Sequence, residues 1–323
     1  MTRPDLLTPA FRALSARLGQ DPLQVQGPGG NTSIKADGVM WIKASGTELA
    51  DAERQNIFVA VDRNAAVKEA REEAGDGSCK TTVLDADIQL RPSIETTFHA
   101  ALDWAVVAHT HSVATISHAI SAEGRNQAAE KLTGLPHVFV PYRKPGLPLT
   151  REILARITPE TQVIVLHNHG LICCGDSVDD VSALIAEVET RLALEPSDTA
   201  TTPPTKNAPN GFSWSEYGWL AQDDAAATCA LGGTYYPDHV VFLGPALPDR
   251  DHDGAPPAIL QRGDGVLIRD DATPPQKAML RCLSDVLARI PAEWSVDPIG
   301  HDAEAELLNW DAEKYRQALA ART

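Results

Sequence analysis

The chain has 323 residues, of which 43% are hydrophobic and 22% are charged, a balance typical of a globular protein with a sizeable core. Its formal net charge of −16 argues against nucleic acid or an anionic membrane surface as a partner, because like charges repel. No apolar run approaches the ~18 residues that span a bilayer, and we expect no secretory signal in the polar first residues. Five scattered cysteines without CxxC spacing favour reduced thiols and a cytoplasmic location.

Hydrophobic spacing predicts alternating helices and strands in the first 195 residues. The expected elements are a helix over 6–19, strands over 39–42 and 57–61, a polar surface excursion over 62–91, a helix over 92–102, helices over 113–118 and 123–132, a strand over 137–140, a strand over 163–166 followed by an apolar run over 171–174, and a helix capped by Ser177 that runs to 194.

Composition changes after this part of the chain, and it indicates two domains. Residues 1–195 are expected to form the main domain, and the Pro-, Thr- and Ser-rich stretch 196–210 a linker. Residues 211–323 are expected to form a small α+β module. Its expected elements are helices over 216–231, 275–290 and 303–321 and strands over 239–243 and 266–268. The segment 310–315 is interpreted as part of a packing helix with a charged outer face, and His239 as the start of a strand rather than a residue that lines a site in a second subunit.

Two histidines follow the apolar run Val106-Val107-Ala108. His109 and His111 are two residues apart, so on a strand both imidazoles point to the same face. Neutral imidazole is a common metal ligand, and two such ligands make half of a tetrahedral zinc site. The alternative is a pair of exposed histidines without a metal. The HxH pattern alone leaves both interpretations open.

A third candidate ligand lies at the end of the strand over 163–166. His169 precedes Gly170, which is expected to let the backbone turn tightly. Three histidines would leave one coordination position open, as in catalytic rather than structural zinc sites. His167 shares the two-residue spacing and is the rival ligand; otherwise it is a residue behind the ligands or at the surface.

Four blocks in a fixed order resemble the class II aldolase/adducin superfamily, to which L-fuculose-phosphate aldolase belongs. They are GGNTS at 29–33, KASG at 43–46, PSIETTFHA at 92–100 with VVAHTHS at 106–112, and VIVLHNHGLICCG at 163–175. The longer form WIKASGT at 41–47 is also similar to the aldolase half of bacterial fusions with a short-chain dehydrogenase. No Gly-rich dinucleotide fingerprint follows residue 195.

The resemblance implies a three-layer α/β/α domain around a mostly antiparallel sheet, and a homotetramer. It assigns His109, His111 and His169 as ligands of Zn²⁺ or another divalent transition metal, and Glu95 as the catalytic carboxylate. This pairing suits carbon–carbon bond cleavage beside a carbonyl, where a cation stabilises the enediolate and a carboxylate moves the proton. Without the resemblance, Glu95 would be interpreted as an acid satisfied by a helix N-terminus.

The glycine-rich loops supply the expected substrate or anion site. Its residues are Gly30, Asn31, Ser45, Gly46 and Ser93, with Lys43 as a further candidate. One departure from the family pattern is Ile94, which stands where phosphate aldolases have a second serine. This leaves a carboxylate or a smaller hydroxylated group open as the anchor instead of a phosphate. Tyr142 lies in a PYRKPG segment similar to a family loop near the active site, and its role is unassigned.

The predicted function is therefore a metal-dependent aldehyde-lyase. It would cleave a ketose phosphate or a related hydroxy-carbonyl compound by a reversible retro-aldol reaction, with a sugar or sugar phosphate as its small-molecule partner. An epimerase or a decarboxylase on the same site stays open. A non-catalytic adducin-like binding module is less favoured, because such domains lack the histidines that this chain has.

Overall fold

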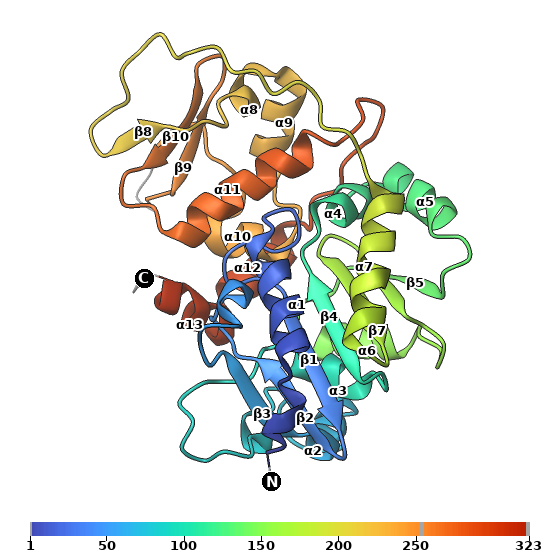
Figure 1. Cartoon of the computed structure of the whole chain (residues 1–323). Helices are drawn as coiled ribbons and strands as arrows, with labels where there is room; N and C mark the ends of the chain where they lie inside the picture. Colours follow the sequence, from blue (N-terminus) through green and yellow to red (C-terminus); the bar gives the residue numbers. More distant parts are fainter. Residues whose placement is uncertain (1, 252–254, 321–323) are drawn as a thin grey trace.

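A seven-stranded mixed sheet forms the centre of the N-terminal part of this computed structural model, which describes residues 2–251 and 255–320 (Figure 1). The strand order is β3-β2-β1-β4-β7-β6-β5, and all neighbours are antiparallel except β5 and β6. The strands are β1 (Asn31–Ala36), β2 (Val39–Lys43), β3 (Phe58–Asp62), β4 (Val106–Thr110), β5 (His137–Val140), β6 (Val163–Leu166) and β7 (Gly170–Gly175). The mostly antiparallel central sheet is confirmed.

Helices cover both faces of this sheet. Successive side chains of a strand point to opposite faces, so Val106 of β4 packs in one core with α1 (Pro9–Gln20) and α7 (Val178–Leu192). Its neighbour Val107 packs in another core with α3 (Thr96–Ala101) and α6 (Leu147–Leu154). The adjacent Cys173 and Cys174 divide between the same two cores. The three-layer α/β/α arrangement is therefore confirmed (Figure 1).

The C-terminal segment, defined here as residues 212–251 and 255–320, packs against α4. Its elements are β8 (Phe212–Trp214), α8 (Trp219–Gln222), α9 (Asp224–Gly232), α10 (Pro237–Leu243), β9 (Ala258–Gln261), β10 (Gly265–Arg269), α11 (Pro274–Leu287), α12 (His301–Leu308) and α13 (Asp311–Ala320). The three strands form a small sheet in the order β8-β10-β9. Helix α4 (Val113–Ala119) and Ile120 share one buried cluster with α8, α10 and α11. This contact brings the C-terminal segment close to the end of β4, where the histidines lie (Figure 1).

Several expected elements differ in extent from those observed. The excursion over 62–91 contains α2 (Arg63–Ala70), which packs Ala66 against the sheet and also buries Ala70, so only part of the excursion lies at the surface. The helix over 216–231 is divided by Asp223, whose side chain caps α9. The helix over 303–321 is divided between α12 and α13, and residue 321 lies outside the described residues.

The strand predicted over 239–243 is wrong, because this stretch belongs to α10. Its β-branched and aromatic residues favour a strand by propensity. Pro237 at the first helical position and Asp238 in the first turn are helix-start signals, and Gly244 lies directly after the last turn. These end signals indicate the observed structure, and the helix turns Asp238 toward the histidines.

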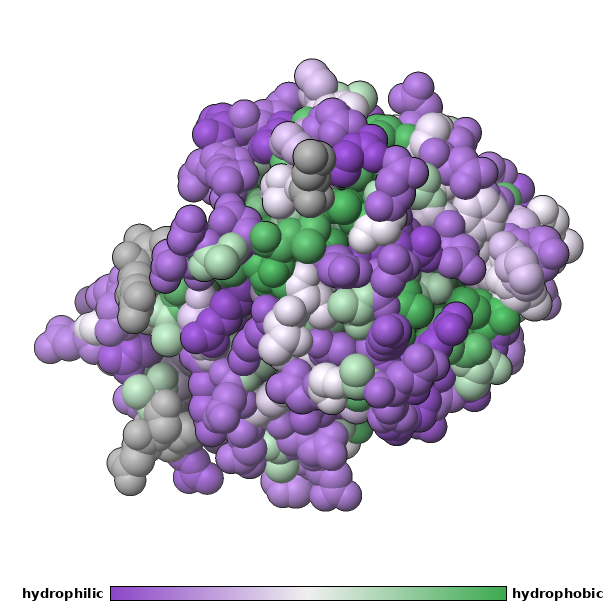
Figure 2. Space-filling model, turned by 90° about the horizontal axis from the view of Figure 1, so that it is seen from below, coloured by the Kyte–Doolittle hydropathy of each residue, from purple (hydrophilic) through white to green (hydrophobic). Residues whose placement is uncertain are grey.

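Hydrophilic residues dominate the face seen in Figure 2, with smaller apolar areas between them. Within the described ranges, Leu84 and Leu308 are the most exposed large hydrophobic side chains. Apolar residues scattered in this way are normal at a protein surface. Across the part of the chain that the structure describes, no helix combines the length and apolar character needed to cross a membrane.

Candidate metal centre

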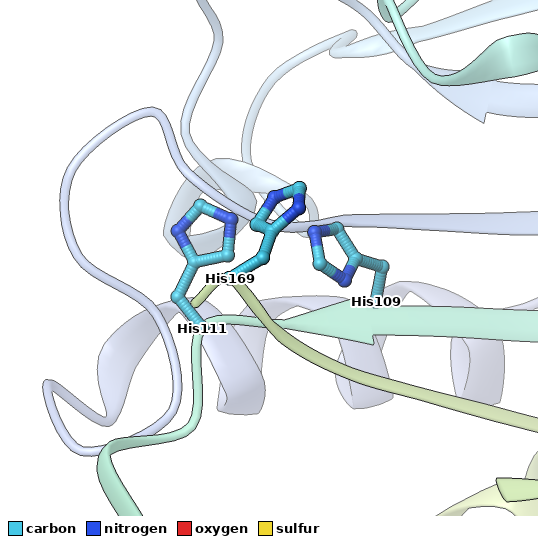
Figure 3. A group of neighbouring side chains, drawn as sticks. All are labelled: His109, His111 and His169. Atoms are coloured by element: carbon cyan, nitrogen blue, oxygen red, sulfur yellow. The ribbon is translucent and has the colours of Figure 1, made fainter. Parts of the chain in front are cut away.

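Three histidine side chains from two strand ends meet at one point (Figure 3). His109 is on β4, His111 directly follows this strand, and His169 lies in the turn between β6 and β7. Their ring centroids are 4.9 to 5.3 Å apart, and one nitrogen of each ring lies within 4.8 Å of the others. All three are buried. This spacing lets three imidazoles bind one ion.

Antiparallel pairing of β4 and β7 brings His169 to the other two. The turn that carries His169 places Asn168 at a φ of 53°, in the left-handed region that Asn tolerates better than most residues. The Asn168 side chain donates to the Asp297 carbonyl at 2.7 Å. Gly170 does not have a positive φ; a Cβ there would collide with the Thr110 carbonyl oxygen. The glycine therefore serves close strand approach, and the expectation that it makes the turn is wrong.

Replacing Gly170 by alanine is expected to destabilise the protein by about 3 kcal/mol, because a methyl group forced against a fixed carbonyl costs about that much. The free energy of unfolding from urea titrations checks this value. Gly232→Ala is the matched control, since a Cβ at Gly232 meets only the Tyr235 hydroxyl, at 4.0 Å. Equal stability of Gly170→Ala and the wild type would contradict the close approach of the strands.

The protonation of the histidines suits a metal. His109 Nδ1 donates to the Leu171 carbonyl at 3.0 Å, which leaves Nε2 as the free nitrogen. Burial lowers the pKa of His109, although the Glu95 carboxylate opposes this, and burial lowers the pKa of His169 well below its ordinary value. Both rings are therefore neutral at pH 7. Within the described residues, His109 Nε2 and His169 Nδ1 have no hydrogen-bond partner. Buried, unpartnered, neutral imidazoles fit a divalent transition metal.

Glu95 faces the same point. Its Oε2 lies 3.4 Å from His109 Nε2, and its Oε1 lies 3.6 Å from His169 Nε2. Helix α3 begins at Thr96, four residues later than the helix expected over 92–102, and the Glu95 side chain makes no capping hydrogen bond to it. Instead, Oε2 accepts a hydrogen bond from Asn31 Nδ2 at 2.8 Å. The interpretation of Glu95 as an acid satisfied by the N-terminus of α3 is therefore wrong.

Asn31 holds Glu95 in place. It pairs with His109 across β1 and β4, which sets its side chain beside the histidines. Its Nδ2 also donates to Ser93 Oγ at 3.3 Å, and its Oδ1 accepts from buried His99. Ser33 Oγ and His99 Nδ1 are 2.7 Å apart, which fixes the His99 ring from the other side. No pattern in the sequence singled out His99, although this histidine lies in the PSIETTFHA block.

The residues predicted to bind an anion line one pocket beside the histidines. They are Gly30, Asn31, Lys43, Ser45, Gly46 and Ser93, together with Glu95, His111 and His169. Gly30 has a φ of 55°, and a Cβ there would lie 2.9 Å from the His109 carbonyl, so glycine is required. Lys43 Nζ donates to the carbonyls of Pro28 and Thr47 and so ties the two loops together. Burial lowers the Lys43 pKa to about 7.

Two further candidates lie away from this pocket. His167 is outside the three-histidine group, its ring packs near Phe139, and burial lowers its pKa to about 4. Tyr142 does not line the pocket either, and burial raises the pKa of its hydroxyl. Among the described residues, neither Tyr142 Oη nor His167 Nε2 has a hydrogen-bond partner.

Three charged residues of the C-terminal segment complete the pocket wall. Arg316 of α13 donates to both Asp238 oxygens, at 2.9 and 3.2 Å, and to both Glu313 oxygens, at 3.0 and 2.9 Å. Asp238 Oδ2 lies 3.3 Å from His111 Nδ1. All three side chains are buried, so the interpretation of 310–315 as a helix with a charged outer face is wrong at Glu313.

The charges in this cluster stabilise one another. Burial alone would raise the pKa of Asp238, but the Arg316 guanidinium and the His111 imidazole bring it well below its ordinary value. Burial raises the pKa of Glu313 to about 6 even though Arg316 opposes this shift. No pattern in the sequence places these residues beside the histidines of the N-terminal part of the chain. The helix-start signal at Pro237-Asp238 could have indicated that Asp238 lies on a helix.

Three buried histidines and a carboxylate thus lie at strand ends of a mostly antiparallel sheet that helices cover on both faces. Residues 12–195 match the family described as the class II aldolase and adducin N-terminal domain, and the chain belongs to this family. The N-terminal class II aldolase domain of a conserved protein from Thermoplasma acidophilum is similar in structure. Its TM-score is 0.51 at 26% identity, and the match covers 59% of this chain and 93% of that one.

Two curated relatives are each 32% identical. One is the uncharacterized oxidoreductase YuxG of Bacillus subtilis, over 176 residues that cover 50% of this chain and 25% of the relative. The other is a 3-oxo-tetronate 4-phosphate decarboxylase of Escherichia coli O6:H1, over 113 residues that cover 31% of this chain and 52% of the relative. The matched part thus spans a quarter of the first protein and about half of the second.

Proposed function

We propose that this chain is a metal-dependent lyase that breaks a carbon–carbon bond beside a carbonyl group in a hydroxy-carbonyl compound such as a ketose phosphate. His109, His111 and His169 would hold Zn²⁺ or another divalent transition metal, and Glu95 would move the proton. The observation that carries the proposal is the convergence of three buried histidines and Glu95 on one pocket. Three buried imidazoles beside a carboxylate have no evident structural purpose.

The chemistry follows from the charge that the reaction creates. Breaking a bond next to a carbonyl leaves negative charge on the carbonyl oxygen, and a divalent cation held by the histidines would supply positive charge there. Glu95 Oε2 is held by Asn31, while Oε1 accepts no hydrogen bond from the described residues. Oε1 is therefore the atom that would take the proton from the substrate and return it to the carbon beside the carbonyl.

The rest of the pocket would bind the far end of the substrate. Ser45, Gly46 and Ser93 line it together with Lys43, and small residues let an anion approach the backbone N–H groups. Ile94 lies in the same wall and offers no hydroxyl donor. Sugars, sugar phosphates and sugar acids are accordingly the candidate substrates. A homotetramer and a cytoplasmic location stay predictions.

Decarboxylation is the second candidate, favoured by the name of the Escherichia coli relative. Loss of CO₂ beside a carbonyl leaves the same charge on the same oxygen, so one site can serve both reactions. A screen of phosphorylated and free ketoses, keto acids and sugar acids with Zn²⁺, Co²⁺ or Mn²⁺ separates the candidates. Aldehyde release indicates aldol cleavage, CO₂ release indicates decarboxylation, and the absence of both from the whole set would contradict the proposed lyase.

Inorganic phosphate and sulfate are expected to inhibit competitively with the substrate found in this screen, because the pocket around Ser45 and Ser93 would take a small anion. Initial rates at several substrate concentrations check the mode of inhibition. Chloride at matched ionic strength is the control and should leave KM nearly unchanged. If phosphate and chloride act alike, the substrate has an uncharged or differently anchored end.

A further inference from the structure

We infer that Asp238, which lies outside the family domain, is a positioning residue of the metal centre. Its carboxylate would accept the Nδ1 proton of His111 and so hold Nε2 of that ring toward the metal. The inference rests on the proposed function, because it takes the three histidines to be metal ligands. It adds a residue from the C-terminal segment to a metal centre whose proposed ligands, like Glu95, all lie within residues 12–195.

The orientation of His111 supports this assignment. Nδ1 of the ring lies 3.3 Å from Asp238 Oδ2, and Figure 3 shows the other ring nitrogen turned toward His169. Metal-binding histidines commonly donate their second ring N–H to a carboxylate or a carbonyl, which fixes the tautomer and the ring direction. His109 does this through the Leu171 carbonyl. Asp238 would do the same for His111.

Asp238 itself is held rigidly. It is 2% exposed, and Arg316 donates a hydrogen bond to each of its carboxylate oxygens. The guanidinium is fixed in turn by both oxygens of Glu313. A bidentate pair sets the plane of the carboxylate as well as its position. Burying such a cluster is costly unless every charge has a partner. Besides Arg316, the His111 ring is the second partner of Asp238 Oδ2.

Gly29 makes the contact possible. A Cβ at this position would lie 2.8 Å from His111 Nδ1 and 2.9 Å from Asp238 Oδ2, so a methyl group would separate the two. Gly29 is not among the positive-φ residues, so the backbone tolerates alanine. Gly29→Ala therefore separates His111 from Asp238 while both side chains and their charges remain, and its Cβ also meets the Gln26 carbonyl oxygen at 3.0 Å. It is an independent test of the same contact.

The experiment measures metal affinity rather than turnover. The full chain and its variants are stripped of metal and titrated with Zn²⁺ against a chelating indicator, and the Co²⁺ absorption spectrum reports the ligand geometry. Asp238→Asn and Gly29→Ala are expected to bind 10- to 100-fold more weakly than the wild type, with an altered Co²⁺ spectrum. Asp311→Asn, an exposed acid on α13, should match the wild type.

The outcomes distinguish failure of the inference about Asp238 from failure of the proposed function. Wild-type affinity and an unchanged Co²⁺ spectrum in both Asp238→Asn and Gly29→Ala would overturn the inference and leave Asp238 as a tie between helices. If the wild type binds no metal under these conditions, the proposed function fails together with it. If Asp238→Asn does not fold, which thermal unfolding in chelator reveals, weaker binding by folded Gly29→Ala supports the inference and unchanged binding contradicts it.

Discussion

Alanine at His109, His111 or His169 is expected to abolish tight metal binding and with it the lyase activity. Each histidine would supply one of three protein ligands, and an alkyl group cannot replace it. All three rings are buried around one point, and each variant leaves only two of the three imidazoles. We expect about one divalent ion per wild-type chain by elemental analysis and less than a tenth of that in each variant.

The matched control for these variants is His167→Ala. His167 is two residues before His169 and has the same side chain, but it lies outside the three-histidine group. It should keep the full metal content. Full retention in all three variants at positions 109, 111 and 169 would contradict the metal centre. Loss in His167→Ala alone would move the third ligand to the rival position.

Glu95→Gln is expected to keep the fold and to lower proton exchange at the substrate carbon beside the carbonyl by about 10²- to 10⁴-fold, the usual contribution of a positioned acid–base group. Glutamine has nearly the same size, and its amide oxygen can still accept from Asn31 Nδ2. It cannot take a proton at pH 7. Deuterium uptake into the ketone product, followed by NMR in D₂O, measures the exchange directly.

Two controls keep this test specific. Glu130→Gln alters an exposed acid on α5 (Ala122–Lys131) that does not line the pocket. This variant should catalyse proton exchange at the wild-type rate. Metal content is measured on the same samples, because Glu95 also faces His109 and His169. An unchanged exchange rate in metal-loaded Glu95→Gln would remove Glu95 from the mechanism.

Local patterns predicted most strands and helices within residues 12–195, because the spacing of apolar residues along these elements matches the period of a strand or a helix. Buried strands such as 163–166 are short apolar runs, and the side-chain period of two explains why His109 and His111 reach one point. Helix length was less predictable. A single residue divides the element expected over 216–231, since Asp223 caps the following helix instead of continuing the preceding one.

The residues that the C-terminal segment contributes to the site were not predicted from the sequence. Propensity favoured a strand over 239–243, although Pro237 and Asp238 suit a helix start. The helical spacing over 310–315 indicated a solvated charged face, but Glu313 and Arg316 are buried because Asp238 lies opposite them. Burial of a charge depends on the partner that folding brings to it, and nothing in the sequence near residue 313 identifies a partner at residue 238.

The sequence by itself determined the family resemblance and, through it, the candidate residues His109, His111, His169 and Glu95, because these residues lie in the blocks that carry the resemblance. Only the tertiary structure decided which groups surround them. Asn31 reaches Glu95 through the pairing of β1 with β4, and Asp238 meets His111 because the C-terminal segment packs on α4. Contacts between distant segments depend on how whole elements pack, and a linear pattern carries no direct record of that packing.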